Sequence, residues 1–155
     1  MKKQQKGFSL IELLIVVAII LIIAAIAIPN LLRSKMAANE AAAVAALRTI
    51  NTSSVAYSTT YGQYPGALAS LGPMTGTSPT STTADLIDSV LAGGIKSGYN
   101  IVYTPGAGTP VGSYTIAAAP VTLGVSGQRG FFTDQTGVIR ADPTGSASAS
   151  STPLS

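Results

Sequence analysis

The chain has 155 residues, enough for one modest domain and a membrane anchor. Nine Lys and Arg residues against six Asp and Glu residues give a formal net charge of +3, but Lys2, Lys3 and Lys6 supply three of the cations. The remainder of the chain is neutral, so its charge does not indicate nucleic-acid binding. The absence of Cys and His excludes thiol nucleophiles, disulfides, imidazole bases and the usual zinc and haem ligands.

Residues 8–28 form an apolar segment in which only Ser9 and Glu12 are polar. As a helix the segment would be about 31 Å long, which is enough to cross a bilayer core. A carboxylate at membrane depth costs about 2.5 to 3.5 kcal/mol on insertion scales, so Glu12 needs a partner. A cut after Gly7 would give Phe8 a free, positive amine that could serve as this partner. A buried charge with such a need indicates a subunit that assembles.

The apolar segment has three interpretations. It can be a plain membrane anchor, or a secretory signal peptide with Ala25-Ile26-Ala27 as a small-x-small cleavage site. Pro29, close behind, and the acid at the start of the apolar core disfavour a signal peptide. The third interpretation rests on the motif Lys6–Leu14, KGFSLIELL, which resembles the processing signal of type IV prepilins and type II secretion pseudopilins.

The resemblance implies a set of site residues. In that family a membrane peptidase cuts after the Gly and methylates the new amine, so the cut falls between Gly7 and Phe8 and Phe8 is methylated. Glu12 matches the family's acid at the fifth position after the cut, and is expected to pair with the Phe8 amine of a neighbouring subunit. Pro29 matches the family's proline and is expected to kink the helix. The lysines before Gly7 favour a cytoplasmic N-terminus.

The resemblance also implies the partners and the location. The subunit would be a homopolymer in a helical filament, processed by the prepilin peptidase/methyltransferase and served by an inner-membrane assembly platform with its ATPase. Before assembly it would lie in inner-membrane lipid as a single-pass precursor, and afterwards in a cell-surface pilus or a periplasmic pseudopilus. We expect no enzymatic activity, no cofactor and no metal. The sequence does not choose among adhesion, motility and DNA uptake.

Residues 29–61 continue the helix with an amphipathic pattern, which Gly62 and Tyr64-Pro65 end. The apolar residues of this half share an arc of roughly 140° on a helical wheel. They are Leu32, Met36, Val44, Leu47, Ile50, Val55 and Tyr61. We therefore predict one helix over residues 8–61, whose first part, 8–28, crosses the membrane or fills a filament core and whose second part packs on a head.

Residues 62–142 predict a small antiparallel β head, giving an α+β, pilin-like fold. After a loop over 72–83, a short helix is expected from Thr82 or Thr83 to Gly93-Gly94, with Asp85 in its first turn. The predicted strands are 99–104, 114–118, a possible third at 121–125, and a hairpin of 129–133 and 138–141 around the turn 134–137. Residues 143–155 are of low complexity and predict a flexible tail.

Four acids of the head could carry chemistry. Asp134 and Asp142 could hold calcium, but two acids eight residues apart lack the dense oxygen array that calcium prefers, which favours a turn residue and a surface acid. Asp85 and Asp88 are better explained as charges at a helix N-terminus than as a general acid/base pair.

Tyrosines and arginines give two further hypotheses. Tyr57, Tyr61 and Tyr64 have helical spacing and could form an aromatic track along a filament, although packing of the head onto the helix explains them more simply. Arg129 and Arg140 flank the last hairpin and could bind phosphate, but two charges on a neutral domain are thin evidence.

Two other functions stay open. The chain could be a pseudopilin that forms a periplasmic piston for protein secretion, or a membrane-anchored binding module that never polymerises. The absence of Cys also excludes the C-terminal disulfide loop common in many type IVa pilins, which leaves the subtype open.

Overall fold

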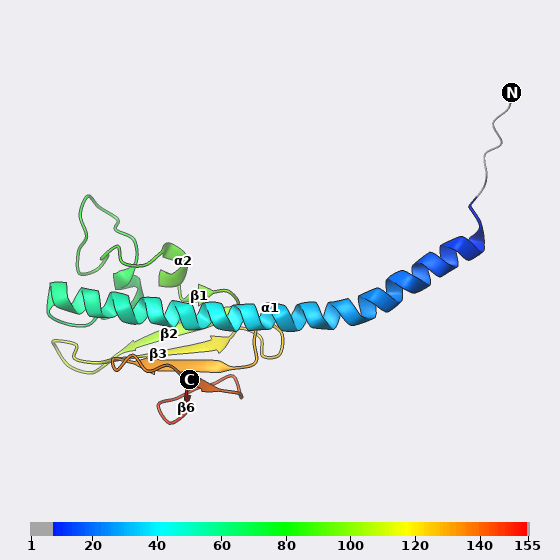
Figure 1. Ribbon diagram of the computed structural model, residues 1–155. Coiled ribbons are helices and arrows are strands. Elements are labelled where there is room, and N and C mark those ends of the chain that lie inside the picture. The colour runs from blue at the N-terminus through cyan, green and yellow to red at the C-terminus, as the bar shows by residue number, and fades with distance from the viewer. Residues whose placement is uncertain (1–7, 155) are drawn as a thin grey trace. The chain divides into compact units, whose positions relative to one another are not determined.

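The computed structural model describes residues 8–154. The chain divides into two compact units, Met1–Lys35 and Met36–Ser155. Helix α1 (Leu10–Tyr61) begins in the first unit and ends in the second. Figure 1 shows it as one continuous helix, as the sequence predicts.

The described part of the first unit, residues 8–35, is an apolar helix whose side chains are almost all exposed. By length and composition α1 can cross a membrane, and its most apolar window is not buried. Pro29 lies inside α1. Proline has no N–H and removes one helical hydrogen bond, so Pro29 weakens the helix locally. The bend expected at Pro29 stays a prediction.

The second unit contains a six-stranded sheet in the order β1-β2-β3-β4-β5-β6, with every neighbouring pair antiparallel. The strands are β1 (Ile95–Lys96), β2 (Tyr99–Pro105), β3 (Tyr114–Pro120), β4 (Gly130–Asp134), β5 (Arg140–Asp142) and β6 (Thr152–Pro153). Two short helices precede them, η1 (Leu68–Leu71) and α2 (Ser89–Ala92). This confirms the predicted α+β fold.

The core lies between the C-terminal half of α1 and one face of the sheet (Figure 1). Successive residues of a strand point to opposite faces, so alternate residues of β2 and β3 enter the core. Fully or nearly buried residues include Leu47 and Ile50 of α1, Tyr99 and Ile101 of β2, Tyr114, Ile116 and Ala118 of β3, and Phe131 of β4. The register aligns Ile101 with Ala118, and Ala118 with Phe131.

The predicted apolar arc of α1 is right at its centre and wrong at its ends. Val44, Leu47 and Ile50 are buried, but Leu32 is 51% exposed and Val55 is 49% exposed. Burial in the last turns passes to Ser53, Ser54 and Tyr57 instead. Only the part of the helix that packs against the head needs an apolar face. A helical wheel does not show at which residues this packing begins or ends.

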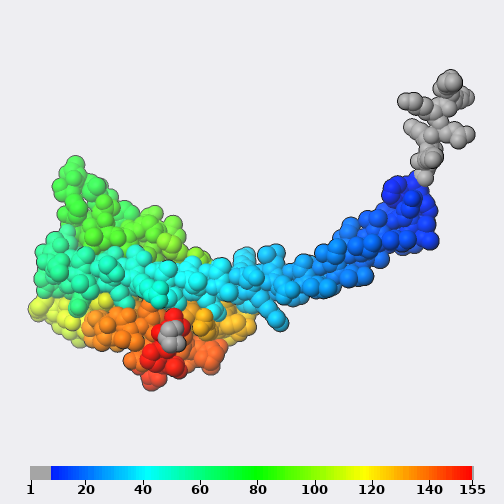
Figure 2. Space-filling model, in the orientation of Figure 1, coloured from blue at the N-terminus to red at the C-terminus, as the bar shows by residue number. Residues whose placement is uncertain are grey.

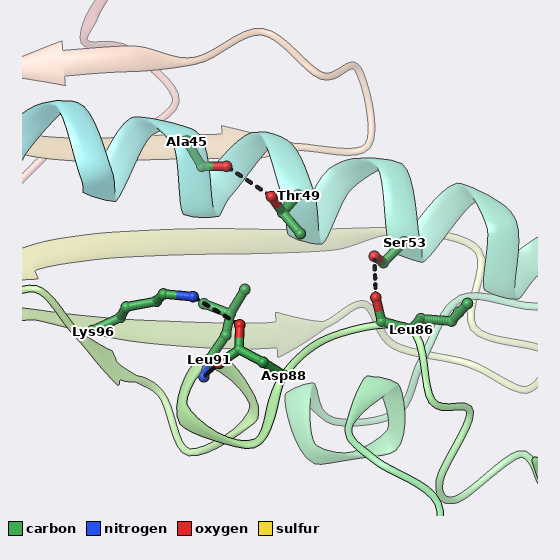
Figure 3. Close-up of polar contacts among 7 residues, drawn as sticks. All are labelled: Ala45, Thr49, Ser53, Leu86, Asp88, Leu91 and Lys96. Atoms are coloured by element: carbon green, nitrogen blue, oxygen red, sulfur yellow. Dashed lines mark hydrogen bonds and ion pairs between the residues drawn. The ribbon is translucent and has the colours of Figure 1, made fainter.

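The short helix begins later than the sequence predicts. Asp85 has a φ of +56°, which is incompatible with a right-handed helix. Asp88 is the N-cap of α2, and its carboxylate accepts the backbone N–H of Leu91 at 2.9 Å (Figure 3). The interpretation of Asp88 as a helix N-terminal charge is therefore confirmed, whereas that of Asp85 is wrong.

The predicted third strand over residues 121–125 is wrong. These residues form a turn, in which the Gly124 N–H donates to the Gly127 carbonyl and the Ser126 N–H donates to that of Thr122. The alternating apolar residues of the segment, Val121, Leu123 and Val125, are all exposed. Alternation predicted a strand, but among residues 8–154 the segment pairs with no strand, and Leu123 makes only an isolated bridge to Gly127.

The predicted strands β2 and β3 and the last hairpin are confirmed. Gly130 pairs with Asp142 and Phe132 with Arg140. Strand β6 lies in the segment 143–155, where the low-complexity sequence predicted a flexible tail, and it pairs with β5. The Leu154 N–H donates to the Ile139 carbonyl at 2.7 Å. Regular structure in this segment was missed because its partner strand, rather than its own composition, orders it.

Candidate functional site

The N-terminus of α1 carries the acid that the sequence singled out. Leu10 is the first helical residue, so Ser9 occupies the N-cap position and Glu12 the third position of the helix. The Ser9 backbone N–H donates to Glu12 Oε2 at 2.9 Å. This is one half of a capping box, in which the acid reaches back to satisfy an N–H that the helix leaves without a partner.

The capping bond was a signal that the sequence analysis missed. A Ser followed three residues later by Glu, directly before an apolar run, is the capping-box pattern. The bond holds the carboxylate near the positive end of the helix dipole. Glu12 Oε1 has no hydrogen-bond donor among residues 8–154, so the carboxylate retains capacity for a second partner.

The surroundings of Glu12 are apolar and exposed. Phe8 is 77% exposed, and the apolar residues on both sides of Glu12 are also uncovered. These include Leu10, Ile11, Leu13 and Leu14. Gly7, the predicted cleavage position, lies outside the described residues. The described part of the site thus combines one capped acid with a continuous exposed apolar surface. Lipid or other protein chains are needed to cover that surface.

The second unit contains an acid that the sequence analysis did not select. Glu40 of α1 is 8% exposed, and it accepts three hydrogen bonds from the segment before β4. The Gln128 N–H donates at 2.9 Å, the Arg129 N–H at 3.1 Å and Arg129 Nε at 2.8 Å. The guanidinium also lies 5.5 Å from the centre of the Phe131 ring. Glu40 therefore fastens α1 to the sheet.

The pKa of Glu40 reflects opposing effects. Burial alone would raise it, but the hydrogen bonds from Gln128 and Arg129, with the positive charge of Arg129, outweigh burial and hold the pKa below its ordinary value. The carboxylate is therefore ionised at neutral pH. The sequence held one signal for this role: Glu40 is a charged residue within an Ala-rich stretch of the helix, on the side that packs against the head.

The acids proposed for calcium do not come together. Asp134 ends β4, whereas Asp142 pairs with Gly130 at its other end. Four strand residues correspond to about 13 Å, too far for one ion. Each carboxylate instead closes its own turn, by accepting the N–H of Thr136 or Thr144. Within the described residues no group of three or more His, Cys, Asp or Glu could hold a metal.

The tyrosines pack between the helix and the head. The Tyr57 and Tyr61 rings lie 4.5 Å apart between centres, and the Tyr57 hydroxyl donates to the Ser81 carbonyl at 2.6 Å. Tyr64 packs edge-on against Tyr114 at 4.9 Å. These contacts agree with the packing explanation.

The two hairpin arginines have partners within the chain. Arg129 binds Glu40, as described above, and Arg140 Nη1 donates to the Ser151 carbonyl at 3.1 Å. Because each arginine already has a partner within the chain, the two do not form a pair of free cations that would support a phosphate site.

These features define a class of protein. The first part of α1 is apolar and uncovered, and it carries a capped acid four residues after Phe8. The second part of α1 packs on a small antiparallel sheet. This combination is that of a prepilin-like subunit. The family model of the prokaryotic N-terminal methylation motif matches residues 2–28. The type IV wide pilus major component PilA4 of Thermus thermophilus is 33% identical over 144 residues, covering 91% of this chain and 96% of that protein.

The chain belongs to the type IV pilin family. No solved structure was found to match it.

Proposed function

We propose that the chain is a structural subunit of a type IV pilus, made as a membrane-anchored prepilin, cleaved after Gly7, methylated at Phe8 and polymerised through α1. The observation that carries this proposal is Glu12, an exposed acid inside an exposed apolar helix that also bears the methylation motif. The first part of this helix, which the head does not cover, needs apolar neighbours. Copies of itself supply apolar cover and, after cleavage, a positive amine.

The capping bond suggests how the acid gains a second partner on assembly. In the precursor, Phe8 N belongs to a peptide bond and is uncharged, and Glu12 accepts the N–H of Ser9. Cleavage converts Phe8 N into an amine, and methylation keeps its positive charge. Glu12 Oε1 then receives the amine of a neighbouring copy while Oε2 keeps the Ser9 N–H. A wrongly placed copy would leave both charges in apolar surroundings, so the pair sets the axial register.

The partners and location follow from this role. The prepilin peptidase/methyltransferase acts on the cytoplasmic side of the inner membrane, with residues 8–28 as the single span. An assembly platform with its ATPase then moves the subunit from lipid into the filament. We propose a structural and not an enzymatic role for the head, whose tyrosines and charged residues largely serve packing and turns.

Mass spectrometry of sheared surface filaments tests the proposal directly. The expected species begins at Phe8 with one added methyl group. Filaments that lack this chain, or contain it with residues 1–7 still attached, would refute the proposal.

A matched pair of Glu12 substitutions tests the role of the charge. Glu12→Gln keeps an acceptor for the Ser9 N–H but removes the charge, whereas Glu12→Ala removes both. Both variants should be cleaved after Gly7 and should fail to enter filaments. Normal assembly of Glu12→Gln would show that the charge pair is not required, and would favour an anchored module or a purely apolar assembly.

Deletion of the chain distinguishes the pilus from a secretion pseudopilus. A pilus subunit predicts loss of long surface filaments seen by electron microscopy, with protein secretion unchanged. A secretion defect in cells that never display filaments would assign the chain to a periplasmic piston instead.

A further inference from the structure

The charged side chains of the second unit leave one cation and one anion without a partner. Lys96 pairs with Asp88 at 2.7 Å and Arg129 with Glu40 at 2.8 Å, while Arg140, Asp134 and Asp142 make the hydrogen bonds given above. Within the described part of this unit, Arg48 and Asp85 alone make no ion pair and no side-chain hydrogen bond. Both are exposed.

Asp85 is held firmly in its exposed position. The backbone N–H groups of residues 84–87 all donate to the segment around η1, at 2.9 to 3.0 Å, with acceptors Ser70, Leu71 and Gly72. Ala84 and Ile87 are buried on either side. The positive φ of Asp85 is tolerated by Asp better than by most residues. The carboxylate is thus presented on a rigid loop.

Arg48 lies at a shallow groove between α1 and the β4–β5 turn. One hollow of about 420 Å³ is lined by Arg48, Asn51, Thr52 and Val55 of α1 and by Gln135, Thr136 and Gly137 of the turn. A second hollow of about 320 Å³ continues past Arg48 toward Val138 and Leu154. Arg48 borders both hollows, so an anion that enters the groove meets its guanidinium.

The two unpaired charges lie on opposite sides of the exposed face of α1. The Ser53 hydroxyl donates to the Leu86 carbonyl at 3.2 Å, which places the Asp85 loop beside the Ser53 side of the helix (Figure 3). Arg48 precedes Ser53 by five residues, or about 140° around the helix. Figure 2 shows α1 of this unit, in cyan, between the green loop segment and the yellow to orange sheet.

We propose that the Asp85 loop of one copy docks into the Arg48 groove of a neighbouring copy, with Asp85 bound to Arg48. The proposal rests on the proposed function, since a filament brings copies of the chain together. Opposite charges on opposite sides of one subunit make a heterologous contact, and such a contact repeats without closing on itself. Leu86, beside Asp85, and Val55, which lines the groove, are both partly exposed and can add apolar contact.

The expected role of this contact is to select one arrangement of neighbours. A solvent-accessible ion pair adds little affinity by itself, whereas like charges in the same place oppose the contact. Repeated along a filament, the pair would set the rotation of successive heads, while the α1 segments supply most of the attraction.

Charge reversal in cells that assemble the full chain provides the first test. Arg48→Glu should reduce the yield of sheared filaments about tenfold, because it opposes Asp85 with a like charge. Asp85→Lys should do the same, and the double variant should recover most of the yield. Asp85→Asn, which keeps the tolerance for positive φ, should have a smaller effect. Equal yields for all four variants would overturn the inference.

Site-directed crosslinking provides a second test that does not depend on yield. The chain has no Cys, so cells can co-express an Arg48→Cys copy and an Asp85→Cys copy in wild-type background. A short bismaleimide should link the two copies into dimers within intact filaments. A bismaleimide is needed because the Cα atoms of an ion-paired Arg and Asp lie farther apart than the roughly 7 Å that a disulfide allows.

An Asn100→Cys copy is the matched control, because Asn100 is exposed and alternates with the buried Tyr99 and Ile101 on β2. Asp85→Cys should not be linked to it. Filaments that give no 48–85 dimer would overturn the inference and leave the proposed function intact. Absence of any filament containing the wild-type chain would instead refute the proposed function.

Discussion

Arg129 binds Glu40 twice, through its backbone N–H at 3.1 Å and through Nε at 2.8 Å, across 89 residues of sequence. Together with the Gln128 N–H, these bonds fix the start of β4 against one turn of α1. Asn39 reinforces the same turn, because its Nδ2 donates to the Ser126 carbonyl at 2.8 Å. The last residues of the turn over 121–127 are therefore tied to α1.

Glu40→Ala should destabilise the second unit. The substitution leaves two backbone N–H groups and Arg129 Nε without their acceptor, and hydrogen bonds to a charged group are worth about 1.5 to 3 kcal/mol each. Because the Arg129 side chain is 46% exposed and water can replace its bond, we expect a loss of about 2 kcal/mol in the free energy of unfolding. Thermal unfolding of the detergent-solubilised chain measures it. A change as small as that of a surface substitution would contradict the assigned role.

The same carboxylate should make stability depend on pH. The pKa of Glu40 is lower in the folded chain than its ordinary value of 4.5, so its contribution is fully present above that value and is lost as the pH falls through the folded pKa. The stability difference between wild type and Glu40→Gln should therefore be constant at neutral pH and shrink below pH 4.5. Unfolding curves of both proteins from neutral pH to pH about 3 test this. A difference that grows on acidification would contradict it.

Two adjacent serines of α1 should respond in opposite ways to substitution by Ala. Ser54 is fully buried, and its hydroxyl has no hydrogen-bond partner within the described residues. Ser54→Ala should therefore be neutral or stabilise by about 1 kcal/mol. Ser53→Ala loses the bond to the Leu86 carbonyl and should destabilise by about 1 kcal/mol. Their thermal midpoints give the comparison directly, and an equal loss in both would contradict the prediction.

Gly127→Ala should destabilise more than Gly137→Ala. A Cβ at Gly127 would collide with the Tyr99 hydroxyl, which is buried and donates to the Arg129 carbonyl at 2.8 Å. Displacing it should cost about 2 kcal/mol or more. At Gly137 no atom lies within 4 Å of a new Cβ, and only the φ of +77° opposes it, at a cost of about 1 to 2 kcal/mol. Urea unfolding of both variants ranks them. The reverse order would contradict the assigned packing.

The hairpin of β4 and β5 shows what local chemistry alone can predict. Asp134 accepts the Thr136 N–H, and Gly137 supplies the positive φ that closes the turn. Both requirements are met within the four consecutive residues 134–137, so the turn was predictable without knowing which other segments pack against it. Residues 121–125 show the opposite case, since alternation predicts a strand only where a partner strand is free to pair.

Glu12 and the apolar run were determined by sequence alone, because membrane depth, helix length and capping depend on residues close together in the chain. Glu40, by contrast, acquires its role only when residues 128 and 129 are brought to it. The ends of the buried face of α1, the late start of α2 and the pairing of β6 were likewise decided by tertiary structure. Each of these features depends on which surface another segment covers. Contacts between segments that are distant in the chain produce no periodic pattern in the sequence.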